Sequence, residues 1–308
     1  MLTYYLLRIA AVLVPRLPLS IGYWLASTAG DLSFWLQRRS RQNVLGNLSY
    51  AMGENASEAE VRAAAREVFR TAAKNYYDLF RVPKLTIEDV RKVVQLRGEE
   101  HVVDAIRQGK GAILVAAHQG NLDVAVQVAV TRSYRATVPV EHVRPEKLFN
   151  LVTRLRADKG VNLVPVDGGA LKAIYRALNN NELVVIAADR DILRNGARVS
   201  FFGEETTLPD APAVLAIRMG TPLLPVRSLR NSDGTFTVEV LPPIELRNSG
   251  SSKDDIRLNT QRVTNTLEKL ISEHPEQWIV FEPVWKMQGD VARQRIGGVR
   301  VGKKEAIG

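Results

Sequence analysis

The 308-residue chain contains no cysteine and only four histidines. The absence of cysteine excludes disulfides, thiolate zinc sites, iron–sulfur clusters and a cysteine nucleophile, and it leaves the redox compartment undetermined. Four histidines are also too few for many arrangements of metal ligands. The chemistry of the chain must therefore rest on side chains other than thiols.

Acidic residues are fewer than basic residues. Lysine and arginine together number 42 against 33 aspartates and glutamates, which gives a formal net charge of +9 and a pI near 9.8. This charge favours an anionic partner, which could be nucleic acid, an anionic membrane leaflet or a phosphorylated substrate. The sequence lacks glycine-aromatic RNA motifs and basic recognition-helix signatures, and its positive charge is dispersed. We therefore expect anionic membrane lipids rather than nucleic acid as the partner.

Long uncharged hydrophobic runs are also missing. The apolar N-terminus, residues 1–30, is interrupted by charged residues and prolines: Arg8, Pro15, Arg16 and Pro18. It is therefore neither a convincing spanning helix nor a secretory signal. Two short helices with exposed apolar side chains, followed by Arg38, Arg39 and Arg41, predict a segment over residues 1–50 that lies in a membrane interface. The alternative is an N-terminal hairpin buried against the core.

The full chain is 45% hydrophobic and long enough for a substantial core. We expect one α/β domain over residues 51–286 and a basic, disordered tail over 287–308. A capping box at Ser57-x-x-Glu60 opens a predicted helix that reaches about Phe80. Asn231-Ser-Asp-Gly234 predicts a hairpin turn between antiparallel strands.

Short apolar runs then alternate with helical stretches. The predicted strands are 93–96, 112–116, 136–140, 161–166, 183–188 and 223–226, and the predicted helices between them include one after Asn121, 146–158 and 170–178. Such alternation is typical of a mixed, mainly parallel sheet flanked by helices.

The most informative stretch runs from Gly111 to Asp123. A buried apolar strand ends at His118, and Gly120-Asn121 begins the next helix, which puts Asp123 in its first turn. Ligands of open α/β sheets bind outside the carboxyl ends of the strands. The His-x4-Asp spacing lets the carboxylate hold one ring nitrogen protonated while the other acts as a general base. Taken alone, such a pair is more often a cap or a surface group, and its strand–glycine–helix context favours the catalytic interpretation.

No serine or cysteine near His118 forms a nucleophile elbow, so direct attack by an activated acceptor hydroxyl is simpler than a covalent acyl-enzyme. Backbone amides around Gly120, or an arginine in the same cleft, would bind the oxyanion, and Gly120 and Asn121 are candidate substrate-binding residues.

Further candidates follow later in the chain. Arg144, Arg154 and Arg156 suit phosphate recognition, although each could equally be an ordinary surface charge. Asp189 and Asp191 end another apolar run, so they fall at the same sheet edge as His118. There Asp189 would either contact His118 as a second carboxylate or cap the next turn. Glu204, after Phe201-Phe202-Gly203, belongs to a stretch that would form either a substrate wall or plain core.

In order along the chain, these features resemble the bacterial lipid A biosynthesis acyltransferase family, which includes lauroyl- and myristoyltransferases of lipid A and phosphatidylinositol mannoside acyltransferases. The resemblance covers roughly residues 1–286. Its matching points are Asn43, Asn47, His118 to Asp123, Arg144-Pro145, Arg154-x-Arg156, Asp189-x-Asp191, Phe201-Phe202-Gly203 and Glu276-Gln-Trp278.

The resemblance implies an α/β fold with an acyl groove, attached to the cytoplasmic face of the bacterial inner membrane. It implies acyl transfer from acyl-CoA or acyl carrier protein without a metal or other cofactor. His118 and Asp123 match the catalytic dyad, and Arg154 matches a position near the phosphate of the acceptor or donor. Asp189 falls where mannoside acyltransferases place a glutamate beside the histidine, so it is a candidate charge relay with a shorter reach.

The leading hypothesis is an O-acyltransferase that modifies a hydroxyl of a glycolipid or lipid A-type acceptor. The alternatives are a phosphatidylinositol mannoside or lysophospholipid acyltransferase, a thioesterase or lipid hydrolase that uses the same dyad, and a basic membrane- or nucleic-acid-binding module without catalysis.

Overall fold

A computed structural model describes residues 11–81, 84–157, 160–166, 169–250 and 252–285. The predicted basic tail, residues 287–308, and the first ten residues of the predicted interface segment lie outside the described residues.

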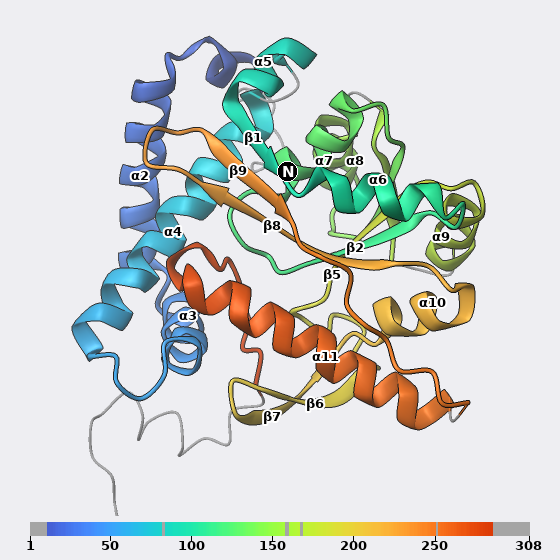
Figure 1. The fold of residues 1–308 in the computed structure, drawn as a ribbon. Helices are drawn as coiled ribbons and strands as arrows, with labels where there is room; N and C mark the ends of the chain where they lie inside the picture. Colours follow the sequence, from blue (N-terminus) through green and yellow to red (C-terminus); the bar gives the residue numbers. More distant parts are fainter. Residues whose placement is uncertain (1–10, 82–83, 158–159, 167–168, 251, 286–308) are drawn as a thin grey trace, which may run out of the picture.

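A seven-stranded sheet forms the centre of the described chain (Figure 1). Its spatial order is β1 (Val94–Arg97), β9 (Phe236–Val240), β8 (Leu223–Arg230), β2 (Ala112–Ala116), β5 (Leu183–Ala187), β3 (Ala136–Val140) and β4 (Asn162–Pro165). The strands from β8 to β4 are parallel, whereas β9 is antiparallel to β8 and carries β1 parallel to itself. The predicted α/β fold with a mainly parallel sheet is therefore confirmed.

Helices cover both faces of the sheet because its central strands are apolar on both sides. Alternate β2 residues pack into different cores: Ile113 and Val115 face one cluster, and Ala112 and Leu114 face the other. The first core includes residues from α2 (Leu19–Leu36), α3 (Arg38–Ala51), α4 (Glu58–Arg81), α9 (Ala170–Asn179), α10 (Ala211–Met219) and α11 (Ser252–Glu273). The second includes residues from α5 (Ile87–Val93), α6 (Glu99–Arg107) and α7 (Leu122–Thr131).

Several local predictions hold in detail. The Ser57 and Glu60 side chains form the expected capping box before α4. The predicted turn at Asn231 closes the β8–β9 hairpin, in which the N–H of Asn231 donates to the carbonyl of Thr235. The separate hairpin of β6 (Ala197–Phe201) and β7 (Glu204–Leu208) and the helices α10 and α11 were not predicted.

The described part of the N-terminal segment contains a helical stretch, a turn and a long helix. Residues 11–13 are helical, the 3₁₀ turn Val14–Arg16 follows, and the 18-residue helix α2 lies alongside α4 (Figure 1). The two helices approach closely because α2 carries glycines at the contact. A Cβ atom on Gly30 would lie 2.6 Å from the Cα of Arg70, and one on Gly22 would overlap the Tyr77 ring.

The opposite face of α2 is uncovered. Its exposed apolar side chains recur at helical spacing and form what we call the α2 stripe: Ile21, Trp24, Leu25, Leu32, Trp35 and Leu36. Among the described residues, no helix has the length and apolarity needed to cross a bilayer. The helix differs from the fully buried hairpin that the sequence left open, because it is packed on one side and exposed on the other.

Candidate active site

The central pair of the site is His118 and Asp189, which end neighbouring parallel strands. The register pairs Ala116 of β2 with Ala187 of β5, so the residues two positions further along are level with each other. The Nδ1 atom of His118 lies 2.7 Å from Oδ1 of Asp189, and the backbone N–H of His118 donates to Oδ2 at 2.9 Å. Asp189 is completely buried, whereas a third of the His118 side chain is exposed. The imidazole is thus held on one side and open on the other.

A third donor converges on the same carboxylate. The indole N–H of Trp278 donates to Oδ2 of Asp189 at 2.7 Å, and Trp278 itself is buried. Burial alone would raise the pKa of Asp189, but the charge of His118 and the hydrogen bonds from His118 and Trp278 outweigh it and hold that pKa below its ordinary value. Asp189 is therefore a carboxylate at neutral pH.

The loop after His118 is tied to the C-terminal segment 277–279. The Gly120 N–H donates to the Gln277 carbonyl at 2.9 Å, and the Ile279 N–H donates to the His118 carbonyl at 2.7 Å. Gly120 has a positive φ of 62°, and a Cβ atom there would lie 1.8 Å from the Ser228 carbonyl oxygen. Gly120 is therefore required by the backbone, and its amide, which the sequence offered as an oxyanion donor, is already paired.

Asp123 has a different partner from the one that its spacing suggested. It lies in the first turn of α7, and its carboxylate accepts a hydrogen bond from Nε of Arg156 at 3.1 Å. Arg156 is at the end of α8 (Glu146–Arg156), and both side chains are about one third exposed. In the structure, Asp189 rather than Asp123 holds Nδ1 of His118, because adjacent parallel strands bring residues 118 and 189 side by side.

A buried ion pair is connected to the loop that follows His118. Arg230, at the end of β8, donates to Asp78 of α4 at 2.6 Å, and both side chains are almost fully buried. Asp78 also accepts hydrogen bonds from Tyr23 and from Asn121, the N-cap of α7. Asn121, predicted to bind substrate, thus connects the His118 loop to this ion pair.

Replacing Arg230 with methionine is expected to lower the free energy of unfolding by about 3–5 kcal/mol, because it leaves the buried Asp78 carboxylate without its cation. Chemical denaturation measures the effect. The Arg107→Met substitution is the matched control. It breaks the exposed pair with Asp104 and should cost less than about 1 kcal/mol. Equal effects of the two substitutions would contradict the importance of this ion pair.

The other predicted residues are spread around the site. Arg144 is exposed just before α8, and Arg154 is exposed in the last turn of that helix. Asp191 accepts hydrogen bonds from the backbone N–H groups of Asn195 and Gly196, so it caps the turn after β5. Glu204 begins β7, opposite Phe201 in the hairpin.

No role was predicted from the sequence for Trp278 or for the ion pairs of Arg190. Arg190 binds Glu141, after β3, and Glu282, in the C-terminal segment. These partners lie 49 and 92 residues away, and Trp278 lies 89 residues from Asp189. The only signal in the sequence was the Glu276-Gln-Trp278 match to the family.

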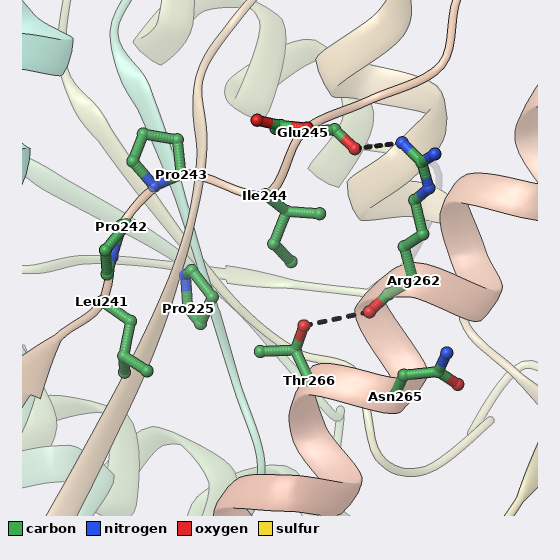
Figure 2. A pocket seen from close by; sticks show the side chains of 9 residues that line it. All are labelled: Pro225, Leu241, Pro242, Pro243, Ile244, Glu245, Arg262, Asn265 and Thr266. Carbon is green, nitrogen blue, oxygen red and sulfur yellow. Dashed lines mark hydrogen bonds between the residues drawn. The ribbon is translucent and has the colours of Figure 1, made fainter.

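Figure 2 shows one of the hollows of the described structure. It has a volume of about 440 Å³ between the segment after β9 and α11, and its lining includes Pro225, Pro242, Ile244 and Arg262. Arg262 donates to the Glu245 carbonyl across it. A second hollow, about 510 Å³, is lined in part by Tyr50, Met52 and Phe202. His118 lines neither hollow. The described residues also contain no cluster of three or more acidic or histidine side chains that could hold a metal ion.

Comparisons with known proteins agree with the resemblance seen in the sequence. Residues 1–287 match the family described as bacterial lipid A biosynthesis acyltransferase. A phosphatidylinositol mannoside acyltransferase of Mycobacterium tuberculosis (strain CDC 1551 / Oshkosh) is 31% identical over 223 residues, which are 71% of this chain and 66% of that protein. One from Mycolicibacterium smegmatis is 29% identical over 73% of each chain. The match thus spans about two thirds to three quarters of these relatives.

Proposed function

Because the chain belongs to the bacterial lipid A biosynthesis acyltransferase family, we propose that it transfers a fatty acyl group from an acyl thioester to a hydroxyl of a glycolipid. The observation that carries the proposal is the His118–Asp189 hydrogen bond at the carboxyl edge of the sheet, within a chain that matches this family over residues 1–287. The donor is acyl-CoA or acyl carrier protein, and no metal or other cofactor takes part.

His118 acts as the general base. Its Nδ1–H is directed to Asp189, which leaves Nε2 to accept the proton of the acceptor hydroxyl. The oxygen attacks the thioester carbonyl, and the tetrahedral intermediate collapses with cleavage of the carbon–sulfur bond. The imidazolium then returns the proton to the departing thiolate. The ester and the free thiol are the products, and the histidine is regenerated.

Asp189 orients the ring and stabilises the imidazolium that forms. It is suited to this role because it is ionised, buried and fixed by three hydrogen bonds. Asp123 would act through its ion pair with Arg156, which brings a guanidinium beside the His-x4-Asp motif. Since the Gly120 amide is occupied, Arg156 is the better candidate to stabilise the oxyanion.

The relatives favour a phosphatidylinositol mannoside-type acceptor over lipid A, because both of those compared above are named phosphatidylinositol mannoside acyltransferases. Such an acceptor carries a phosphate, and so does either acyl donor. The exposed arginines of α8 and of the turn before it, Arg144 and Arg154, have the chemistry to bind such a group.

We further propose that the α2 stripe lies in the interface of an anionic membrane, on its cytoplasmic face. Trp24 is 66% exposed, Trp35 58% and Leu36 72%. Arg38 and Arg39 follow directly and are also exposed, so the helix presents apolar side chains beside cations. An interfacial position gives the enzyme access to a lipid acceptor.

Changing both Trp24 and Trp35 to serine is expected to weaken binding to phosphatidylglycerol-containing vesicles by about tenfold or more, because each tryptophan loses the apolar area that it would bury in lipid. Vesicle co-sedimentation measures the change. Leu171→Ser is the control, since Leu171 is 56% exposed but belongs to α9, at the other end of the sheet (Figure 1). If the double variant binds like the wild type, the α2 stripe does not contact the membrane.

The reaction itself is tested with the purified protein, an acyl thioester and a phosphatidylinositol mannoside. Mass spectrometry should detect the acylated glycolipid and the free thiol in equal amounts. Release of free fatty acid without acylated lipid would instead indicate a hydrolase. Parallel reactions with acyl-CoA and acyl carrier protein identify the donor.

A further inference from the structure

We propose that Trp278 is a positioning residue of the acyl transfer, which fixes the Asp189 carboxylate in the orientation that holds His118. The inference rests on the proposed function and extends it to the C-terminal segment. Trp278 donates its indole N–H to Oδ2 of Asp189, while Oδ1 of the same carboxylate receives Nδ1 of His118.

The geometry leaves the carboxylate little freedom. A carboxylate held by its two bonds from His118 could still tilt about the axis that they define. The 2.7 Å bond from Trp278 supplies a third point of attachment, from a different element of the fold. Because the Asp189 side chain is completely buried, no water can take the place of the indole donor without a cavity being opened.

Trp278 is itself held in place. Its two neighbours Gln277 and Ile279 make backbone hydrogen bonds to Gly120 and His118. Its ring packs against Phe201 and Trp285. Further along, the α3 side chain of Asn47 donates to the carbonyls of Val280 and Glu282. The C-terminal segment therefore delivers the indole to Asp189 as part of a fixed structure.

The indole also affects the charge of Asp189. Burial, which would raise the pKa of Asp189, is opposed first by the charge of His118 and then by hydrogen bonds that include the one from Trp278. The charged neighbour in the sequence, Arg190, directs its guanidinium to Glu141 and Glu282. Among the described residues, His118 and Trp278 are thus the side chains that bond this carboxylate.

The test replaces Trp278 with phenylalanine, which keeps an aromatic ring and removes the N–H donor. Trp285→Phe is the matched control, because Trp285 belongs to the same aromatic cluster and is also buried, but its N–H donates to the Phe201 carbonyl. Both variants are made in the full chain, and circular dichroism and thermal melting establish that each is folded.

Three measurements are expected to separate the variants. For Trp278→Phe, kcat should fall about tenfold with an unchanged KM for the acyl donor, because orientation rather than binding is impaired. A carboxylate that has lost one donor attracts protons more strongly, so the His118–Asp189 pair binds its proton more tightly and the acidic limb of the pH–rate profile moves to higher pH. The proton resonance of the His118–Asp189 hydrogen bond, assigned by its loss in His118→Asn, should shift. Trp285→Phe should change none of the three.

If Trp278→Phe keeps the wild-type kcat, acidic limb and proton resonance, or if Trp285→Phe changes them equally, the proposal is overturned. The resonance measurement needs no substrate. It therefore tests the positioning role even if the wild-type protein fails to transfer an acyl group, a result that would overturn the proposed function alone.

Discussion

Replacing His118 with alanine is expected to lower the rate of acyl transfer by about 10²–10⁴-fold, because it removes the general base that activates the acceptor hydroxyl. The Nε2 atom has no protein partner among the described residues, since the side chain is bonded through Nδ1 alone. A third of the side chain is exposed, so the loss of packing is limited. The rate is measured as acylated glycolipid formed per enzyme molecule with saturating donor.

The control for this prediction is His118→Asn. An asparagine amide can still donate to the buried Asp189 carboxylate, but it has no basic nitrogen, so the fold is kept and the base is lost. Both variants should be equally inactive while their melting temperatures differ. A His118→Asn protein that transfers acyl groups at the wild-type rate would exclude His118 as the base.

The second large effect is expected for Asp189→Asn, which should also lower kcat by about 10²–10⁴-fold. The substitution preserves the shape of the side chain but removes its charge. An amide that donates to Nδ1 would favour the wrong tautomer, with the proton on Nε2, and it would no longer stabilise the imidazolium. The measurement is kcat over a pH range in which the wild type is fully active.

The matched control is Asp191→Asn, two residues further along. Asp191 receives backbone hydrogen bonds from Asn195 and Gly196 and makes no contact with His118 among the described residues. It should keep most of the activity if the loss in Asp189→Asn comes from the imidazole. Comparable losses in both variants would point instead to a general requirement for the loop after β5.

The strands and the location of the site could be predicted from the sequence for a physical reason. Strands buried on both faces are uninterrupted apolar runs, and Ala112–Ala116 and Leu183–Ala187 stand out as such. Each run stops at polar residues, and in parallel strands those stops lie at one edge. The positions of His118 and Asp189 at a common edge of the sheet therefore follow from the apolar runs that precede them.

The contacts that these residues make could be predicted less well from the sequence. The sequence offered Asp123 through its spacing and Asp189 through its place at the same sheet edge, and the register of β2 against β5 makes Asp189, 71 residues away, the neighbour of His118. The same holds for Trp278 and for the buried pair of Arg230 and Asp78, which come from elements distant in the chain. Local patterns describe strands and helices, whereas contacts between them depend on how the elements pack.

A double-mutant cycle tests most directly whether His118 and Asp189 act as one catalytic unit. The rates of acyl transfer are measured for His118→Ala, for Asp189→Asn and for the double variant. If Asp189 acts through the imidazole, the double variant is no slower than His118→Ala alone, because without the base the carboxylate has nothing to orient. Losses that multiply in the double variant would show that the two residues act independently, which would contradict a single catalytic unit.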